Sequence, residues 1–255
     1  SESALQNVLF SRLFVPVNVP ICRFQLQLAI AALKNNVLFA LPRAMDSFFI
    51  CCIVAFNFRR FLSVIQMTEL FRWFFKKKVL FIASSSEAAL KLKKDFIART
   101  GFPESETCAY VNATKKNSGN LDCGTYSVIF STAESMLDNT GDLSGCDFGL
   151  VVIDEAERAA VGSHSICVLI RNLLLAKVLF RLIAFTSSPI NKVAMLQSLV
   201  TNLQIGQIYS TGNVCEDMQL LVSSPKLVAQ YISLPEELSK ISVAFLNGVL
   251  RAHGV

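Results

Sequence analysis

The sequence lacks the residue patterns of a zinc site. It contains no CxxC pair, and neither of its 2 histidines stands at zinc-ligand spacing. Several of the 8 cysteines lie inside apolar runs; they are Cys22, Cys51, Cys52, Cys108, Cys123, Cys146, Cys167 and Cys215. We therefore expect no metal site, and we interpret the cysteines as reduced, buried thiols of an intracellular protein.

The sequence also lacks an apolar run long enough to cross a membrane. The longest uninterrupted run, Phe48 to Phe56, has nine residues, whereas a membrane span needs about 18 to 20. No basic region followed by a long apolar core opens the chain, so no signal peptide is evident. We expect no membrane partner, and we expect residues 48–56 to form a helix that is buried on all sides in a layered domain.

Charged residues are few, at 17% of the chain, while apolar residues make up 53%. This composition and 255 residues suit one large globular domain or two small ones. The net charge of +5 is only weakly indicative of a polyanionic partner. Lys76, Lys77 and Lys78 form the one cationic cluster, and such a run is more typical of a solvated helix end than of a DNA contact.

Short apolar runs alternate with helical patterns, which predicts an α/β fold. The expected strands are 37–41, 79–83, 127–131, 150–154 and 181–186. The expected helices are 24–34, 47–75, 87–100, 133–137, 165–175 and 194–202. This alternation favours a parallel sheet with helices on both faces, whose chemistry gathers at the carboxyl edge. Residues 101–126 are rich in Gly, Asn, Thr and Ser and are expected to form a surface connection.

The loop after the first strand, LPRAMDSFF, has the position of a phosphate loop but contains neither glycine nor lysine. A phosphate loop needs glycines so that backbone N–H groups can turn inward, a lysine for the phosphates, and a hydroxyl for magnesium. After the fourth strand, VVIDEAERA places Asp154 and Glu155 where an ATPase holds its magnesium-side acid and its water-polarising acid. The loop therefore argues against ATP binding, whereas the two acids argue for it.

Five segments in order resemble the first RecA-like domain of superfamily 2 helicases of the Fanconi anaemia group M (FANCM) and archaeal Hef type. These segments are FQLQLAIAALKNNVLFALP, FICCIVAFNF, VVIDEAERA, RLIAFTSSP and VTNLQIGQI. The resemblance runs from about Pro20 to Leu238 and implies a RecA-like, P-loop NTPase-type parallel sheet in a nuclear DNA repair protein. It divides the chain into an N-terminal extension (1–20), the RecA-like domain (21–209), and an exit strand and helix (210–255) that lead toward an absent second domain.

The phosphate loop departs from the family pattern Leu-Pro-Thr-Gly-x-Gly-Lys-Thr at every position that would touch phosphate or magnesium. Ala44 and Asp46 replace the two glycines, Ser47 the lysine and Phe48 the magnesium-binding hydroxyl. The lost lysine contact alone is worth about 1.5–3 kcal/mol. Arg43 returns positive charge from a different point of the loop.

Other nucleotide motifs have drifted as well. Gln25, the adenine reader that the resemblance implies, is retained, while Cys22 replaces an arginine. Glu157 stands where the family has the histidine of its acid box. The coupling motif to which that histidine connects reads Thr186, Ser187 and Ser188.

In the loops that face DNA in the family, hydroxyls remain but a lysine is lost. Ser85 and Thr132 are the positions that the resemblance implies for contacts with the DNA backbone, and such contacts position a strand without reading its sequence. The first helix is longer than the family's, and residues 59–72 are either an insertion or an artefact of the gene model.

These departures predict a pseudo-ATPase that keeps the fold, needs no cofactor, and binds DNA weakly or serves as a scaffold for protein partners in a DNA repair complex. Two alternatives stay open. One is an active ATP-dependent DNA translocase, which would use ATP and magnesium. The other is a purely structural interaction module.

Overall fold

The computed structural model describes residues 13–15, 19–42, 45–64, 77–111, 125–139, 147–187, 192–210, 240 and 244–245, with the backbone alone for 59–64 and 139. The chain divides into two units, Ser1–Val222 and Ser223–Val255. Of the second unit, Lys240, Ala244 and Phe245 are described, and they are helical.

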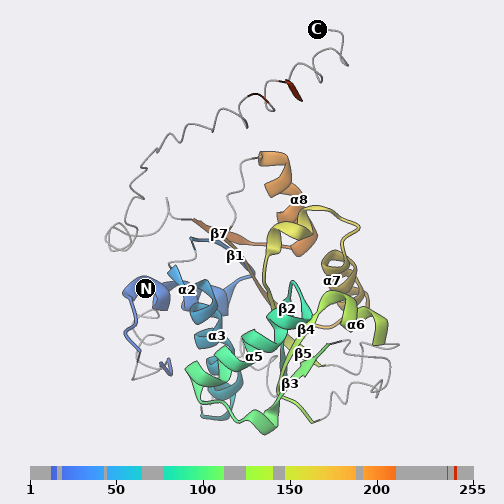
Figure 1. Ribbon diagram of the computed structural model, residues 1–255. Coiled ribbons are helices and arrows are strands. Elements are labelled where there is room, and N and C mark those ends of the chain that lie inside the picture. Colours follow the sequence, from blue (N-terminus) through green and yellow to red (C-terminus); the bar gives the residue numbers. More distant parts are fainter. Residues whose placement is uncertain are drawn as a thin grey trace. The chain divides into compact units, whose positions relative to one another are not determined.

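A seven-stranded, wholly parallel sheet forms the centre of the first unit, with the order β3-β4-β2-β5-β6-β1-β7 (Figure 1). The strands are β1 (Val37–Ala40), β2 (Lys78–Ala83), β3 (Thr107–Tyr110), β4 (Val128–Thr132), β5 (Phe148–Ile153), β6 (Arg181–Thr186) and β7 (Gln207–Ser210). Every residue of β4 and β5 is buried, as expected for strands that are covered on both faces.

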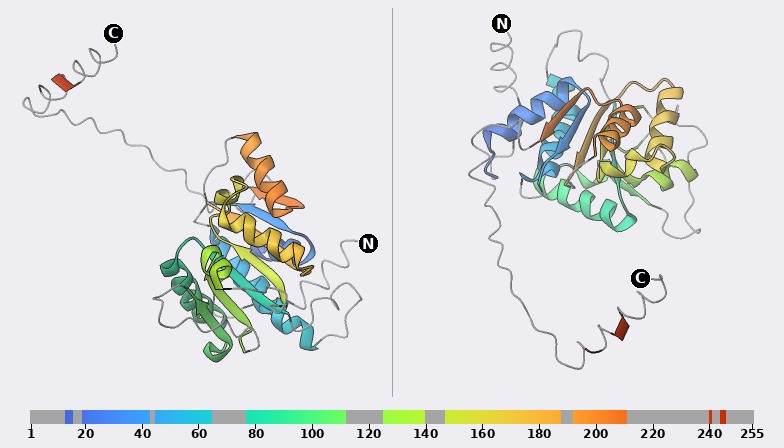
Figure 2. Two further views of the ribbon diagram at one scale, coloured as in Figure 1. Left: turned by 90° about the vertical axis from the view of Figure 1, so that its right-hand side faces the viewer. Right: turned by 90° about the horizontal axis from the view of Figure 1, so that it is seen from above.

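Helices cover both faces of the sheet (Figure 2). They are α2 (Arg23–Lys34), α3 (Ser47–Val64), α5 (Ser86–Thr100), α6 (Ala133–Asn139), α7 (Ser165–Leu175) and α8 (Val193–Leu203), with the short 3-10 helices η2 (Glu104–Glu106) and η4 (Ala156–Ala160). Alternate strand residues feed two cores, because side chains point to opposite faces along a strand. Phe39 and Phe81 pack with α2, α3 and α5, whereas Leu38 and Leu80 pack with α6, α7, α8 and η4.

The prediction of a parallel sheet with helices on both faces is confirmed, and the ends of the expected strands and helices agree within two residues, except for the C-terminal end of the helix expected over 47–75. The long first helix is confirmed from Ser47 to Val64, and residues 65–76 lie outside the described part of the chain. Residues 49–55 are at most 3% exposed. This segment is therefore the buried helix that the apolar run predicted.

Two expectations were wrong. Residues 101–126 are not only a surface connection, because β3 pairs with β4 within them. Lys77 and Lys78 do not end a helix: Lys78 begins β2, and the Nζ of Lys77 lies 3.2 Å from Asp147 with its side chain 15% exposed. The expected exit strand and helix after residue 210 lie outside the described residues, apart from the three helical positions named above.

The cysteines of the described residues are unpaired, as expected. Cys51, Cys52 and Cys167 are buried, and Cys22 and Cys108 are half-buried. Burial raises the pKa of the Cys51 and Cys52 thiols, which keeps both protonated and inert. No helix among the described residues has the length and apolarity needed to cross a bilayer.

Candidate functional site

A cleft of ≈ 370 Å³ lies at the carboxyl edge of the sheet, where the loops after β1, β5 and β6 meet. Its walls come from the start of α3, one side of α5, and the residues that follow the two strands. The lining residues are Leu41, Asp46, Ser47, Phe48, Lys91, Leu92, Asp154, Glu155, Phe185, Thr186 and Ser187. The fold thus brings together three motifs that lie at residues 41–48, 154–155 and 185–187 of the sequence.

The loop between β1 and α3 is anchored by its backbone. The Leu41 N–H donates to the Thr186 carbonyl at 3.2 Å, and the Met45 N–H donates to the Pro42 carbonyl at 2.9 Å. The side chain of Met45 is 1% exposed and joins the core under α3. Arg43 and Ala44 lie outside the described residues.

Asp46 caps the N-terminus of α3. Its backbone has a φ of 49°, the left-handed region that a glycine adopts freely and that Asp tolerates. Its Oδ1 accepts the Phe49 N–H at 3.2 Å, and its carbonyl accepts the same N–H at 2.9 Å. A carboxylate therefore occupies the helix end at which N–H groups would otherwise be free to bind an anion.

Arg99, from the last turn of α5, pairs with the other oxygen of this carboxylate. Its guanidinium carbon also lies 5.7 Å from the centre of the Phe48 ring and 5.8 Å from that of Phe49. Partial burial opposes the charge, but the hydrogen bond and the charge of Asp46 prevail and raise the pKa of Arg99. The negative charge of Asp46 at the start of α3 is thus balanced by a cation of the protein itself, Arg99.

Ser47 and Phe48 form the first turn of α3. Ser47 is 9% exposed. The Phe48 ring is half-buried and meets the ring of Phe81 on β2 edge-on, with their centres 6.0 Å apart. Phe48 therefore belongs to the aromatic core on this face while one side of it lines the cleft.

Asp154 and Glu155 follow β5 at the opposite wall of the cleft. The Glu155 N–H donates to Asp154 Oδ1 at 2.8 Å, and Glu155 has a φ of 50°. Burial raises the pKa of Asp154 to about 6, and the neighbouring charges of Glu155 and Glu157 act in the same direction. Glu155 is paired with Arg158, with Oε2 and Nη2 2.7 Å apart.

Glu157 lies on η4, where it is half-buried and close enough to Asp154 for its charge to act on that carboxyl. Thr186 and Ser187 line the cleft directly, and Thr186 is 2% exposed. Ser188 lies outside the described residues. The structure thus places two residues of the predicted coupling motif in the same cleft as the acids.

Gln25 is used within its own helix. Its Oε1 accepts the Cys22 N–H at 3.0 Å at the start of α2, and its side chain is 7% exposed. It is not among the described residues that line the cleft. Its predicted role as an adenine reader remains a prediction.

Ser85 and Thr132 both cap helices. Ser85 is exposed, and its Oγ accepts the Ala88 N–H at 3.1 Å at the start of α5. Thr132 is 5% exposed, donates to the Oγ of Ser135 at 2.9 Å, and accepts the Ser135 N–H at 3.1 Å. Of these two predicted nucleic-acid contacts, only Ser85 presents its side chain to solvent.

Neither Arg99 nor Lys91 was predicted from the sequence as a residue of the site. Arg99 is 53 positions from the aspartate with which it pairs, and no local pattern connects the two. Lys91 is exposed on α5 and lines the cleft, and it makes no ion pair or hydrogen bond with the rest of the described chain. An acid at the position of a loop glycine could have prompted a search for a compensating cation, but it would not have told which one.

Comparison with known families gives one match that covers just over half of the chain. The model described as "Type III restriction enzyme, res subunit" matches residues 61–190. This segment contains the acids after β5 and the start of the coupling motif. It begins after residues 41–48 and so leaves the loop untested.

The chain is also similar to curated DNA-acting proteins. It is 25% identical over 234 residues to the Fanconi anemia group M protein homolog of Mus musculus, covering 91% of this chain and 11% of that protein. It is 25% identical over 246 residues to the ATP-dependent DNA helicase fml1 of Schizosaccharomyces pombe, covering 96% of this chain and 27% of the other. The chain thus spans about a tenth to a quarter of the length of these relatives.

Solved structures support the RecA-like fold. The Pyrococcus furiosus Hef helicase domain matches with a TM-score of 0.60 at 21% identity, over 73% of this chain and 37% of that one. The Sulfolobus solfataricus SWI2/SNF2 ATPase core in complex with dsDNA matches with a TM-score of 0.55 at 18% identity, over 76% and 38%. The sheet and its two helical layers therefore have a RecA-like fold.

Proposed function

The chain belongs to the family described as "Type III restriction enzyme, res subunit", and from this premise we propose that it is a superfamily 2 helicase-like domain that no longer hydrolyses ATP. In this proposal it acts as a DNA-binding or scaffolding pseudo-ATPase of a nuclear DNA repair complex. The observation that supports the loss of ATP turnover is the carboxylate of Asp46 at the N-terminus of α3, held there by Arg99.

The Asp46 carboxylate takes the position at which a phosphate would bind. A helix N-terminus attracts anions through its free N–H groups and its dipole, and Asp46 already uses the Phe49 N–H. A triphosphate would have to displace this carboxylate from both the helix and Arg99, or approach it as a like charge. Either path weakens nucleotide binding.

The neighbouring side chains do not fit magnesium-bound ATP. Phe48 presents a ring that is packed against Phe81, and a ring offers no oxygen to a cation that requires oxygen ligands. Ser47 cannot supply the positive charge of the missing lysine. With a pKa of about 6, Asp154 is partly protonated just below neutral pH, and a protonated acid is a poor partner for magnesium.

A DNA partner is supported by the relatives. The S. pombe relative is an ATP-dependent DNA helicase, and one structural neighbour was solved with dsDNA. In this chain, Ser85 is exposed at the start of a 15-residue helix, where a hydroxyl and N–H groups can contact a phosphate. Such contacts are made to the charged DNA backbone without reading its sequence, so binding should be weak and sensitive to salt.

One observation favours the alternative of an active translocase. Lys91 reaches the cleft from α5 and has no ionic partner in the described part of the chain. In that case Lys91 would supply the phosphate contact that Ser47 cannot. We rank this below the pseudo-ATPase because Lys91 faces a cleft that also contains three carboxylates, those of Asp46, Asp154 and Glu155.

Phosphate release and DNA binding, measured on the same samples, test the proposal. We expect the domain to bind a fluorescent DNA duplex with an affinity that falls between 50 and 200 mM salt, and to release no phosphate from MgATP with or without DNA. Glu155→Gln serves as the matched control, because release that persists in this variant comes from a contaminant. DNA-stimulated release that Glu155→Gln abolishes would overturn the proposal, and its loss in Lys91→Gln would establish the alternative.

A further inference from the structure

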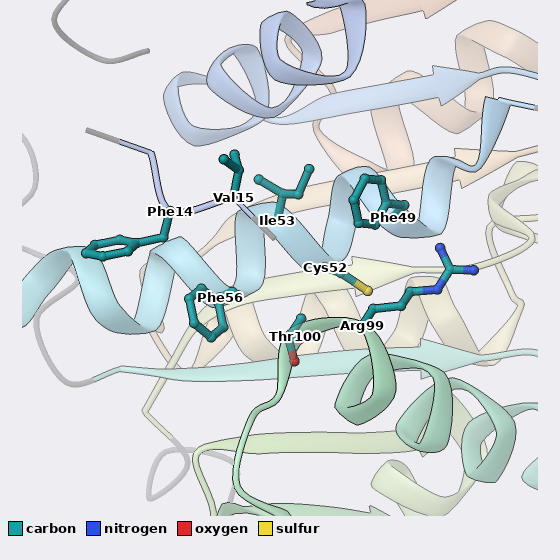
Figure 3. A pocket seen from close by; sticks show the side chains of 8 residues that line it. All are labelled: Phe14, Val15, Phe49, Cys52, Ile53, Phe56, Arg99 and Thr100. Carbon is teal, nitrogen blue, oxygen red and sulfur yellow. The ribbon is translucent and has the colours of Figure 1, made fainter. Parts of the chain in front are cut away.

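A second cavity, of ≈ 270 Å³, has the side chain of Arg99 in its wall (Figure 3). It is lined by α3, the end of α5 and the segment 13–15, and it is partly open to solvent. Phe14 and Phe56 lie at one end, and Phe49 and Arg99 lie at the other. At about 30 Å³ for each water molecule, the cavity suits a ligand of about ten non-hydrogen atoms.

The wall formed by Phe14 and Val15 is fixed in place by Asn57. The Phe14 N–H donates to Asn57 Oδ1, and Asn57 Nδ2 donates back to the Phe14 carbonyl, both at 2.7 Å. Asn57 is fully buried and also donates to the Ile53 carbonyl at 2.7 Å. The cavity is therefore bounded by a specific contact and not by a loosely lying terminal segment.

The polar groups of the cavity leave one charged group for a ligand. The Thr100 hydroxyl donates to the Phe96 carbonyl at 2.7 Å and accepts the Phe102 N–H at 3.3 Å, so it is already satisfied. Burial raises the pKa of the Cys52 thiol and keeps it neutral. Arg99 is the only charged residue that lines the cavity within the described chain, and only its Nη1 is engaged by Asp46.

We propose that this cavity binds a small organic carboxylate with an apolar body of about ten non-hydrogen atoms. The body lies among the rings of Phe14, Phe49 and Phe56, and the carboxylate pairs with Arg99. A guanidinium presents its donors in a fork that matches a carboxylate. An apolar cavity with a single convergent charge is the usual form of such a site.

The site shares Arg99 with the start of α3. A ligand carboxylate and the Asp46 carboxylate compete for the same guanidinium, so removal of the Asp46 charge should tighten ligand binding. The two substitutions should therefore have opposite effects on ligand binding: loss of Arg99 should weaken it, and loss of the Asp46 charge should tighten it. The inference does not rest on the proposed function, because binding is measured without nucleotide or DNA.

Calorimetric titration with octanoate tests the proposal on the whole chain. We expect one saturable site with a Kd below about 1 mM, and at least tenfold weaker binding of octan-1-ol. Arg99→Gln should weaken octanoate binding at least tenfold, and Asp46→Asn, which keeps the helix cap, should tighten it about threefold or more. Val15→Trp should weaken it at least fivefold by filling the cavity, and exposed Lys94→Gln on the same helix should leave it unchanged.

Circular dichroism identifies any variant that has lost its fold, and Val15→Trp keeps the test valid if Arg99→Gln is unstable. Equal affinities for octanoate and octan-1-ol would reduce the site to apolar adsorption and overturn the proposal. The same holds for an Asp46→Asn variant that binds no more tightly than wild type, and for the absence of octanoate binding up to about 5 mM.

Discussion

Asp46 combines a left-handed backbone conformation with a carboxylate at the start of α3. Its φ of 49° lies in the left-handed region, which costs an ordinary residue about 1–2 kcal/mol but which Asp visits more readily than most. The cap on the Phe49 N–H and the pair with Arg99 offset this cost. The helix start is therefore stabilised by side chains of the protein and does not need a bound phosphate.

Residue-level roles were only partly predictable from the sequence. The changes at Asp46, Ser47 and Phe48 could be read from their positions in the loop, because a glycine, a lysine and a hydroxyl each have a defined task there. The partners of these residues could not, since Arg99 reaches Asp46 from another helix. The use of Gln25 as a cap within α2 also follows from local geometry that the sequence does not reveal.

The raised pKa of Asp154 predicts a pH-dependent cost to stability. With a folded pKa of about 6 and an unfolded value of about 3.9, the native state holds more protons between these values, so the free energy of unfolding falls as the pH rises through them. Asp154→Asn keeps the Oδ1 acceptor for Glu155 and should be about 1–2 kcal/mol more stable than wild type at pH 7.5, and no more stable at pH 4. Urea unfolding at several pH values measures this, and a stability difference that does not change with pH would contradict it.

Asn57 should be a strong contributor to stability. Asn57→Ala removes three hydrogen bonds from a fully buried site, and we expect the free energy of unfolding to fall by about 2–4 kcal/mol. Asn35→Ala is a matched control, because Asn35 makes only an exposed side-chain bond of 3.2 Å to Gln207; it should cost about 0.5 kcal/mol or less. Equal losses in the two variants, measured by urea unfolding, would show that the link to Phe14 does not matter.

Among the elements, the central strands were predictable and the edge strands were not. The strands β2, β4 and β5 are apolar runs that are buried on both faces, so their composition identifies them. β3 and β7 have four residues each and are mostly half-exposed. Such strands carry little hydrophobic signal and depend on a neighbour for their pairing, which the sequence does not show.

The start of β5 is a tightly packed point of the sheet. A Cβ added to Gly149 would lie 2.6 Å from Lys77 Cβ and 2.9 Å from Phe58 Cε1, so we expect Gly149→Ala to destabilise the domain by about 2–3 kcal/mol. Gly206→Ala is the control, because its nearest contact would be the Asn36 carbonyl at 3.5 Å, and its cost should stay within about 0.5 kcal/mol. Thermal unfolding of both variants measures the difference, and a neutral Gly149→Ala would contradict this packing.

At the scale of the whole molecule, the fold class follows from the alternation of strands and helices, while the proposed function depends on the side chains that line the cleft. The sheet order and both helical layers are those of a RecA-like domain. The chain nevertheless covers only 11% of one relative and 27% of another. The activities of those proteins therefore do not transfer to this domain without a measurement.

A domain that does not bind nucleotide, as proposed, should bind DNA equally well with and without ATP. We expect the affinity for a DNA duplex, measured by fluorescence anisotropy at 50 mM salt, to be the same with and without 1 mM MgATP. In a translocase the two ligands influence each other reciprocally. A change in DNA affinity of threefold or more on addition of MgATP would contradict this prediction, because it would show that nucleotide binding alters DNA binding.

Isothermal titration with MgATP tests most directly whether the loop after β1 prevents nucleotide binding. It is performed on the wild-type domain and on a variant that carries Ala44→Gly, Asp46→Gly, Ser47→Lys and Phe48→Thr. We predict no binding to the wild type up to about 1 mM nucleotide and saturable binding to the variant, because the substitutions remove the Asp46 carboxylate and restore the phosphate contacts. Binding to the wild type at micromolar concentration would contradict the proposal that this loop prevents nucleotide binding. Absence of binding to the folded variant would show that the loop is not the cause.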